Sequence, residues 1–374
     1  MKQPLRILIA GLTAEKGGME AYVMNLYRFM DRDRIQFDFV NHLKGEPIAY
    51  QEEIEALGGK IYNIPMLRNG IREHFAKLKK LFQENSYAAV YYQANRRMKS
   101  TDLFRYAKKY QVPLRILHSH NTKTAENESG LNRLRAQLIR NQLDRYLTDR
   151  FACSKEAGEW MFGEDANFRV INNGVDCAKF DFNASARQDV RQSMKAEDRR
   201  VYGTVGRLSD QKNPFFLADI FAEIHRLQPE SVFWHIGGGE YEQEMKEYIK
   251  EKGIADSYLL LGRRDDVAEL LSGMDVYLMP SKYEGFPISL VEAQCNGLTC
   301  VVSDVITKDV DLSGNVQFVS LNKSAAEWAE SAVNLSGNPR KSEREKIREK
   351  GYDIHQIVKE LSEYIEKKAG GEGR

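Results

Sequence analysis

The chain has 374 residues and a formal net charge of +1, with 42% hydrophobic and 29% charged residues. This length suits two domains with sizeable cores, and this composition is typical of a soluble globular protein. No apolar run approaches the ~20 residues of a membrane-spanning helix, and a near-neutral chain without a recognition motif argues against a nucleic-acid partner.

The first residues lead directly into a predicted strand that begins at Arg6. We therefore expect no signal peptide and a cytoplasmic protein. The four cysteines show neither a Cys-x-x-Cys pair nor a histidine spacing suited to zinc, so we expect reduced thiols. They are Cys153, Cys177, Cys295 and Cys300.

Strand-like and helical segments alternate along the first half of the chain. The predicted strands are Arg6–Gly11, Gln36–Val40, Ala88–Tyr92, Leu114–Ser119, Arg150–Cys153 and Val170–Asn172. The predicted helices between them include Met19–Met30, Arg72–Glu84 and Leu131–Leu147. Strands that alternate with helices favour a parallel sheet with helices on both faces.

Basic residues are concentrated in this half. Residues 1–170 hold 28 Lys and Arg against 20 Asp and Glu, whereas the remainder holds 27 against 34. Such a surface either contacts an anionic membrane or a lipid-diphosphate acceptor, or is a solvated face, and the sequence leaves both open. The residues concerned are Lys77, Lys79, Lys80, Arg96, Arg97, Lys99, Arg105, Lys108 and Lys109.

A second alternating series follows a polar stretch between Asn173 and Arg199. Its predicted strands are Val201–Gly206, Val232–Gly237, Tyr258–Leu261, Asp275–Pro280, Thr299–Ser303 and Gln317–Leu321. Two such series predict two Rossmann-like domains, residues 1–175 and residues 176–353. A last helix, about His355–Lys368, falls in a C-terminal segment of residues 354–374 that ends in a Gly-rich tail.

Glycine and charged residues follow four successive strands of this second series, and ligands of open parallel sheets gather at the carboxyl ends of strands. After the first strand, Gly206 lets the chain turn, and Arg207 and Lys212 lie within reach of a diphosphate. Asn213 and Pro214 suit an N-cap and a first helical position. Alone, this segment is weak evidence, because Arg and Lys are common on surfaces.

The next two strand ends carry further glycines and arginines. Gly237, Gly238 and Gly239 allow a close ligand approach or a sharp turn, without the G-x-G-x-x-G spacing of a dinucleotide site. Arg263 and Arg264 follow the third strand. Four strand ends of this kind predict one ligand site along a single edge of the sheet.

Two glutamates near the fourth strand end, Glu284 and Glu292, carry the most information in the chain. Gly285 and Pro287 keep their loop tight, and Ser289 is expected to cap a helix whose first amides form an anion site. This array offers acceptors for sugar hydroxyls on either side of a phosphate cradle, which suits a nucleotide-diphosphate sugar. The alternative is a solvated loop glutamate and a second one that only complements the helix dipole.

Together these segments resemble the retaining glycosyltransferases of family 4. Glu284 and Glu292 match the family's pair of glutamates separated by seven residues, and Arg207 and Lys212 match its Gly-Arg-Leu…Lys-Asn segment. Further matches, between about Arg6 and about Asp353, are Gly17-Gly18-Met19-Glu20, His118-Ser119-His120-Asn121 and Asn173-Gly174-Val175-Asp176. A narrower likeness to bacterial exopolysaccharide and capsule enzymes rests on Met24–Arg28, His118–Thr122 and Ser303-Asp304.

The resemblance implies the GT-B fold, in which two Rossmann-like, doubly wound parallel-sheet domains face a cleft. The first would be the acceptor side, the second would bind the donor, and the last helix would cross back to the first. It implies a retaining transfer of a hexose or N-acetylhexosamine from a nucleotide-diphosphate sugar, expected to be a UDP-sugar, to a lipid-linked exopolysaccharide or capsule oligosaccharide. No cofactor and no metal are expected.

The resemblance also assigns roles to residues. Glu292 would accept hydrogen bonds from the ribose hydroxyls, whereas Glu284 would face the transferring sugar and, with His120, act in catalysis. Arg207 and Lys212 would neutralise the leaving diphosphate. Donor binding is expected at Gly18, Arg207, Lys212, Gly238, Arg263, Gly285, Phe286, Pro287, Ser289, Leu290 and Glu292.

The two histidines His118 and His120 are predicted to lie on one side of a strand. His120 is the favoured functional residue, because it lies further toward the carboxyl end, next to Asn121. His118 and Asn121 are expected on the acceptor side. A lone histidine is more often a core or surface residue, so which of the two acts stays open.

Two other classes of function remain open. A nucleotide-sugar 2-epimerase shares this architecture but needs no sugar acceptor. A non-catalytic subunit of a polysaccharide complex would bind the donor without turnover. The donor sugar, the acceptor and the oligomeric state are not legible from the sequence, and peripheral contact with the inner face of the plasma membrane is one of the open alternatives for the basic half.

Overall fold

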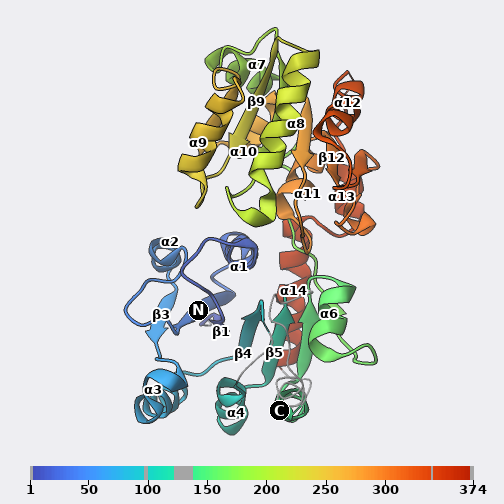
Figure 1. Cartoon of the computed structure of the whole chain (residues 1–374). Helices are drawn as coiled ribbons and strands as arrows, with labels where there is room; N and C mark the ends of the chain where they lie inside the picture. Colours follow the sequence, from blue (N-terminus) through green and yellow to red (C-terminus); the bar gives the residue numbers. More distant parts are fainter. Residues whose placement is uncertain (1–2, 97–99, 122–137, 338–339, 371–374) are drawn as a thin grey trace. The chain divides into compact units, whose positions relative to one another are not determined.

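The computed structural model describes residues 3–96, 100–121, 138–337 and 340–370. The chain forms two compact units, Met1–Gly174 with Ile354–Arg374, and Val175–Asp353 (Figure 1). Some predictions fall outside the described residues: the basic Arg97 and Lys99, and residues 131–137 of the predicted helix Leu131–Leu147. Of the rest of that helix, residues 138–143 are helical.

The first unit is built on a seven-stranded parallel sheet in the order β3-β2-β1-β4-β5-β6-β7. Its strands are β1 (Leu5–Ala10), β2 (Ile35–Asn41), β3 (Lys60–Asn63), β4 (Ala89–Ala94), β5 (Leu114–Ser119), β6 (Asp149–Ala152) and β7 (Arg169–Val170). Strand β3 is not among the predicted strands, because it has only four residues and lies half-exposed at the sheet edge, without an apolar run.

Helices cover both faces of this sheet. Its helices are α1 (Gly18–Phe29), α2 (Gln51–Ala56), η1 (Leu67–Asn69), α3 (Ile71–Glu84), α4 (Asp102–Lys109), α6 (Lys155–Phe162) and α14 (Ile354–Gly370). Successive strand residues point to opposite faces, so that Ile7 and Ile9 join the core under α1 and α14, whereas Leu8 joins the core under α3, α4 and α6. The C-terminal helix α14 therefore packs within the first unit, beside α1.

The second unit is built on a six-stranded parallel sheet in the order β10-β9-β8-β11-β12-β13. Its strands are β8 (Arg200–Val205), β9 (Ser231–Ile236), β10 (Tyr258–Gly262), β11 (Val276–Met279), β12 (Thr299–Ser303) and β13 (Val316–Val319). Its helices are α7 (Ala184–Ser193), η2 (Asp210–Lys212), α8 (Pro214–Leu227), α9 (Glu242–Glu251), α10 (Val267–Gly273), α11 (Ile288–Cys295), η3 (Lys308–Val310), α12 (Ala325–Leu335) and α13 (Arg344–Glu349).

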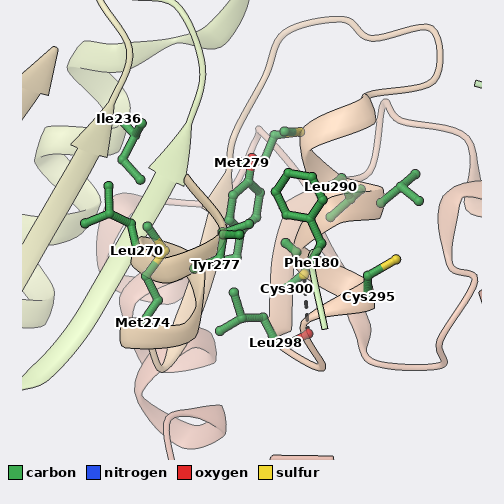
Figure 2. Close-up of a cluster of buried hydrophobic side chains, with 14 of the residues drawn as sticks. Phe180, Ile236, Leu270, Met274, Tyr277, Met279, Leu290, Cys295, Leu298 and Cys300 are labelled. Carbon is green, nitrogen blue, oxygen red and sulfur yellow. Dashed lines mark hydrogen bonds between the residues drawn. The ribbon is translucent and has the colours of Figure 1, made fainter. Parts of the chain in front are cut away.

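Two apolar cores hold the second sheet between its helices. Helices α8, α9 and α12 close one face, and α7, α10, α11 and α13 close the other. Figure 2 shows part of this second core, where Leu290 of α11 and Tyr277 of β11 lie among buried apolar side chains. The burial of Leu290 and Val291 fixes the face that α11 turns away from the core, and this face carries Glu292.

Both sheets have the doubly wound order, which confirms the predicted fold class. In each sheet the strand order reverses beside the first strand, between β1 and β4 and between β8 and β11. Ligands of such sheets bind beyond the carboxyl ends of the strands at this switch point. The loops after β8 and β11 are therefore where a ligand of the second unit is expected.

The two chain crossings between the units run side by side. The amide of Val175 donates to the carbonyl of Tyr352 at 2.9 Å, and Val175 forms a parallel bridge with Asp353. Gly174 lies so close to α14 that a Cβ there would stand 2.6 Å from Ile357 Cδ1. In the described part of the chain, every helix is too short or too polar to cross a bilayer.

Candidate active site

The loops after β8 and β9 approach each other so closely that only glycine fits at two positions. A Cβ on Gly237 would stand 2.0 Å from the carbonyl oxygen of Gly206, and one on Gly239 would stand 2.3 Å from that of Leu208. Gly237 also has a φ of +131°, a conformation that favours glycine. Gly238, the predicted ligand contact, is less constrained, and its carbonyl accepts from the Leu208 amide at 3.1 Å.

An ion pair joins the loops after β8 and β11 at the switch point. Lys212 Nζ lies 2.5 Å from Glu284 Oε1, and the two side chains are only 19% and 7% exposed. Gln211 Nε2 donates to the other oxygen of Glu284 at 3.3 Å and to the carbonyl of Tyr283 at 3.0 Å. The sequence places Lys212 and Glu284 in different segments, so neither their pairing nor the contribution of Gln211 could be predicted.

Further contacts hold these two loops together. The amide of Lys282 donates to the Gln211 carbonyl at 2.8 Å, and Lys282 Nζ pairs with Asp210 at 2.5 Å. Pro214 occupies the first helical position of α8, as predicted. Asn213 is the N-cap residue, but its side chain does not cap the helix as predicted; it donates to the carbonyl of Pro280 at 3.2 Å. The loops after β8 and β11 are therefore held together by their own contacts.

Helix α11 begins two residues earlier than the capping role of Ser289 requires, so that prediction is wrong. Pro287 is the N-cap, and Ser289 lies inside the first turn, where its Oγ accepts from the Tyr277 hydroxyl at 3.0 Å. The Leu290 amide donates to the Pro287 carbonyl at 3.1 Å. Within the described residues, the amides of Ile288 and Ser289 have no protein acceptor, so they are the free donors at this helix start.

An aromatic stack holds the loop between the two glutamates. The ring of Phe286 lies on that of Tyr352, with centroids 5.0 Å apart and planes at 10°. Tyr352 accepts the hydrogen bond from Val175 at the chain crossing. Gly285 has open space around its Cα, which leaves room for a ligand beside the loop. The loop that carries Phe286 is thus fastened to Tyr352 and, through it, to Val175.

Glu292 lies in the second turn of α11 and is partly exposed. Burial raises the pKa of Glu292 to about 8, and the positive charge of Lys179 opposes this shift. The carboxyl group therefore holds a proton at neutral pH. A protonated carboxyl donates one hydrogen bond, whereas the ionised form can accept from both hydroxyls of a diol.

This raised pKa predicts a measurable effect on folding. An unfolded glutamate releases its proton near pH 4.3, so above that pH the native state holds a proton that the unfolded state has lost. The contribution of Glu292 to the free energy of unfolding is complete below the unfolded pKa and is lost as the pH rises through about 8. Thermal melts from pH 5 to pH 9 should show a stability decline that Glu292→Gln removes. If the difference in melting temperature between wild type and Glu292→Gln does not vary with pH, the raised pKa of Glu292 is contradicted.

Arg207 and Arg263 are exposed residues on the loops after β8 and β10. Both lie at the carboxyl edge of the sheet, as predicted, because they follow the ends of β8 and β10, the parallel strands on either side of β9. The turn before Arg263 is shaped by Gly262, which has a φ of +62° and accepts from the Gly237 amide at 2.7 Å. These guanidinium groups are thus placed near the loops that hold Lys212 and Glu284.

The first unit brings the two predicted histidines together. The rings of His118 and His120 stack with centroids 4.1 Å apart, which confirms that they share one side of the strand. His118 is fully buried, and its Nδ1 bonds the Tyr91 hydroxyl at 2.6 Å. Full burial argues against a direct contact between His118 and an acceptor. His118 instead packs against the ring of His120.

His120 extends past the end of β5 and is partly exposed. Its Nε2 lies 2.7 Å from Gln93 Oε1, and because this oxygen only accepts, Nε2 carries the proton. Burial lowers the pKa of His120 to about 3, and burial with the neighbouring His120 lowers that of His118 well below its usual range. Both rings are therefore neutral at physiological pH. The sequence gives no sign of Gln93.

The remaining predicted residues of this unit lie at the same edge of the first sheet. Asn121 follows His120, and its Nδ2 donates to the carbonyl of Asn95 at 3.3 Å. Gly18 is the first residue of α1, with open space around it. The loop before α1 is closed by Glu20, whose carboxylate accepts from the amide and hydroxyl of Thr13 at 3.0 and 2.8 Å. Glu20 is buried, so it shapes this loop from inside.

Known proteins resemble this chain in sequence. Residues 185–354 match the family model described as glycosyl transferases group 1. The chain is 32% identical over 354 residues to the protein EpsF of Bacillus subtilis (strain 168), which is named as a glycosyltransferase, and the match covers 92% of this chain and 91% of that protein. It is 36% identical over 162 residues to the Escherichia coli UDP-Gal:alpha-D-GlcNAc-diphosphoundecaprenol alpha-1,3-galactosyltransferase, which covers 42% of this chain and 41% of that enzyme.

Solved structures share the fold at low sequence identity. The crystal structure of Anabaena HepE in complex with UDP and glucose matches with a TM-score of 0.74 and 18% identity, over 96% of this chain and 99% of that one. The pneumococcal O-GlcNAc transferase GtfA in complex with UDP and GlcNAc matches with a TM-score of 0.69 and 13% identity, over 99% of this chain and 100% of that one. Two parallel-sheet units and these likenesses identify the GT-B fold. The chain belongs to the group 1 glycosyl transferases and is a glycosyltransferase of the GT-B fold.

Proposed function

We propose that this enzyme transfers a hexose or N-acetylhexosamine, with retention, from a UDP-sugar to a lipid-linked saccharide of exopolysaccharide assembly. The observation that carries the donor assignment is the joined pair of loops at the switch point, where Lys212 and Glu284 are paired beside the free amides of α11. The names of the relatives support the nucleotide and the acceptor class: one acts on a UDP-sugar and a lipid diphosphate, and HepE binds UDP.

The donor diphosphate is assigned to the start of α11. The amides of Ile288 and Ser289 would donate to the distal phosphate, and the positive end of the helix favours its charge. Arg207 and Lys212 would neutralise the diphosphate as its bond to the sugar breaks. A phosphate at this point would compete with Glu284 for Lys212, so donor binding would loosen the ion pair and free the carboxylate for the sugar.

The other donor groups follow from this placement. Glu292 would accept from the ribose hydroxyls, Arg263 would lie near the base, and the backbone from Gly285 to Pro287 would line the sugar. Glu284 would bond a hydroxyl of the sugar that transfers. In the first unit, His120 and Gly18 are assigned to the sugar and the diphosphate, and Asn121 to the acceptor side.

Retention would follow an internal-return route. The bond between the anomeric carbon and the phosphate oxygen breaks, the leaving phosphate takes the proton of the acceptor hydroxyl, and that hydroxyl oxygen forms the new bond on the same face. A neutral His120 would not act as a charged acid, because burial holds its pKa near 3. With the Nε2 proton held by Gln93, its Nδ1 would accept a hydrogen bond from a sugar hydroxyl. The base that removes the acceptor proton would therefore be an oxygen of the leaving phosphate, and no side chain would be needed for this step.

Peripheral membrane contact through the basic residues of the first unit is a weaker proposal. Several of these residues are paired with acids on their own helices: Lys77 with Glu73, Lys80 with Glu84, and Arg105 with Asp102. Such pairs lower the net charge that a membrane would meet. Cosedimentation with vesicles of anionic lipid would test it, and equal binding to neutral vesicles would contradict an electrostatic contact.

The test of function is a product assay with two arms. UDP-sugars that raise the melting temperature are first chosen from a panel, since a ligand of the native state stabilises it. Each is then incubated with the enzyme alone and with lipid-linked saccharide acceptor. We expect UDP release and a larger lipid product only with the acceptor. An epimerised sugar from the donor alone would indicate a 2-epimerase, and binding without turnover on any acceptor would indicate a non-catalytic subunit.

Metal independence is a separate expectation. Two cationic side chains and a helix start would carry the phosphate charge. Transfer activity should therefore persist in excess EDTA. Complete loss that Mn²⁺ or Mg²⁺ restores would show that a metal bridges the diphosphate.

A further inference from the structure

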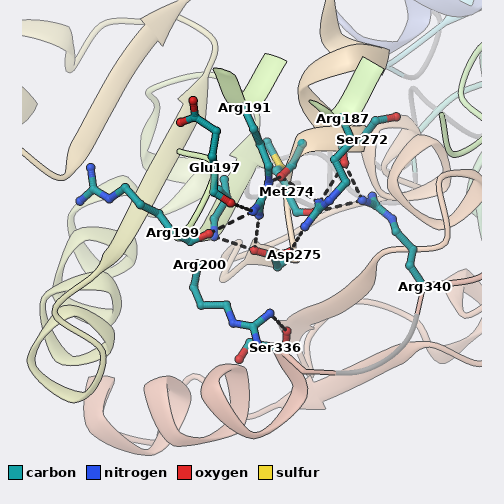
Figure 3. Close-up of polar contacts among 12 residues, drawn as sticks. Arg187, Arg191, Glu197, Arg199, Arg200, Ser272, Met274, Asp275, Ser336 and Arg340 are labelled. Atoms are coloured by element: carbon teal, nitrogen blue, oxygen red, sulfur yellow. Dashed lines mark hydrogen bonds and ion pairs between the residues drawn. The ribbon is translucent and has the colours of Figure 1, made fainter. Parts of the chain in front are cut away.

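A polar pocket lies at the amino edge of the second sheet, at the opposite ends of the strands from the donor loops. Arg200 opens β8, Asp275 precedes β11 and Thr299 opens β12, and all three line this pocket. Its cavity volume is about 190 Å³. Arg187 from α7 and Arg340 from the segment before α13 complete its charged lining (Figure 3).

The arginines of this pocket have a structural role that accounts for part of their arrangement. Asp275 receives Arg187 on one oxygen and Arg191 on the other, each at 2.5 Å, and its second oxygen also accepts from the Val201 amide at 2.8 Å. Other guanidinium nitrogens donate to backbone carbonyls at the end of α10. These carbonyls belong to Leu271, Ser272, Gly273 and Met274.

These contacts satisfy hydrogen bonds but do not neutralise the charge. Asp275 is the one carboxylate that Arg187, Arg191, Arg200 and Arg340 contact in the described part of the chain. The carboxyl end of α10 adds about half a negative charge, so four guanidinium groups face about one and a half negative charges. Burial, followed by the repulsion of Arg187, lowers the pKa of Arg340 to about 9. The pocket therefore holds an excess of positive charge.

The pocket also has donors and space to spare. Arg200 is exposed, and its described contact is a single bond from Nη1 to the Ser336 carbonyl at 3.1 Å. Its Nε and Nη2 can therefore turn to a ligand, as can the Thr299 hydroxyl. A volume of about 190 Å³ equals that of roughly six waters. It is smaller than the ~300–1,000 Å³ of ordinary drug-sized sites, so a compact anion fits better than a whole nucleotide.

We propose that this amino-edge pocket binds a small free phosphate anion, inorganic phosphate or diphosphate, at a site separate from the donor loops. Arg187 and Arg200 supply charge-assisted hydrogen bonds, and Arg340, which is held over the Phe182 ring at 4.6 Å, supplies positive charge. The anion joins α7, β8 and the segment before α13, so it stabilises the second unit. The inference rests on the pocket alone and does not require the proposed transfer reaction.

Diphosphate titrated calorimetrically into the full-length protein at low salt tests the site. Saturating UDP is present throughout, so that the donor loops are occupied. Arg200→Ser removes a lining charge with one backbone contact, and Arg34→Ser is the matched control, an exposed arginine of the first unit that pairs with Glu366. We expect Arg200→Ser to weaken diphosphate binding about ten- to hundredfold, the usual effect of losing a charge-assisted hydrogen bond, and Arg34→Ser to bind like wild type.

Two outcomes would overturn the proposal. One is equal diphosphate affinity for Arg200→Ser and wild type. The other is diphosphate binding that appears in a parallel titration without UDP but is absent in saturating UDP, since all binding would then be at the donor loops. UDP affinity measured on the same variants should be unchanged. If UDP itself does not bind, the donor assignment fails, and the comparison of Arg200→Ser with Arg34→Ser still decides the pocket.

Discussion

Replacing Lys212 by methionine is expected to lower turnover by about 10²–10³-fold, the scale for losing a preorganised charge contact to a developing anion. It should also destabilise the fold by about 1–3 kcal/mol, because the variant leaves the Glu284 carboxylate, 7% exposed, without its cation. Arg207→Ala should cost turnover on the same scale with little loss of stability, because Arg207 is exposed. Steady-state kinetics and denaturant melts of both variants measure the two effects separately.

The double variant Lys212→Met with Glu284→Gln separates the folding effect from the catalytic one. Removing both charges leaves no unpaired carboxylate, so most of the stability should return, whereas turnover should stay low. Lys212→Arg is the conservative control, because it keeps a charge near the loop. Wild-type turnover in both Lys212→Met and Arg207→Ala, with the true donor, would show that the diphosphate is placed elsewhere.

Much of the fold follows from local pattern. Apolar runs that alternate with amphipathic helices predict the parallel sheets, and all the predicted strands are present within one or two residues at most ends. The miss, β3, has little signal, since a short edge strand buries few side chains. The cap at Ser289 fails for a different reason: Pro287 already has the extended conformation of an N-cap, and the Tyr277 hydroxyl engages Ser289 instead.

The site was predictable as a set of strand ends but not as a set of contacts. Glycine and charge after successive parallel strands indicate one edge of a sheet, which is where Arg207, Lys212 and Glu284 lie. Their pairing depends on tertiary geometry, because Lys212 and Glu284 are 72 residues apart. Gln93 beside His120 is hidden for the same reason: a buried polar residue in a strand has no local pattern.

The arginine pocket shows a second limit of sequence reasoning. Arg187, Arg191 and Arg340 read as ordinary surface charge, and their residue numbers give no hint of a common partner. They converge because the end of α10 and Asp275 present carbonyl and carboxylate oxygens at one point. A cluster of cations from separate segments around one acid depends on the tertiary fold, so it cannot be predicted from the local sequence pattern.

The two glutamates should divide donor recognition between binding and catalysis. Glu292 is assigned to the ribose, which does not react, so Glu292→Gln should raise the Michaelis constant for the donor and weaken UDP binding. Glu284 is assigned to the transferring sugar, so Glu284→Gln should lower kcat. UDP lacks that sugar, and the substitution also releases Lys212 from its ion pair. UDP affinity of Glu284→Gln should therefore be intact or slightly higher.

The raised pKa of Glu292 adds a proton signature to this prediction. Below about pH 8 the free enzyme holds the proton, whereas a ribose diol is best bound by the ionised group, which accepts from both hydroxyls. UDP binding should therefore release protons and tighten as the pH rises toward 8, by linkage. Calorimetry in two buffers of different ionisation enthalpy measures this release. In Glu292→Gln, UDP binding should release no proton from residue 292, and the UDP affinity should depend less on pH.

The assignment fails in a recognisable way. If Glu284→Gln abolishes UDP binding while Glu292→Gln leaves both the affinity and the proton release unchanged, the two roles are reversed, and α11 would carry the sugar rather than the ribose. Misfolding can be distinguished from a loss of UDP binding, because Gln keeps the shape of Glu. The melting temperature of each variant also reports whether the second unit is folded. Glu292→Gln should even be more stable than wild type above pH 8, since it removes a carboxylate that burial disfavours.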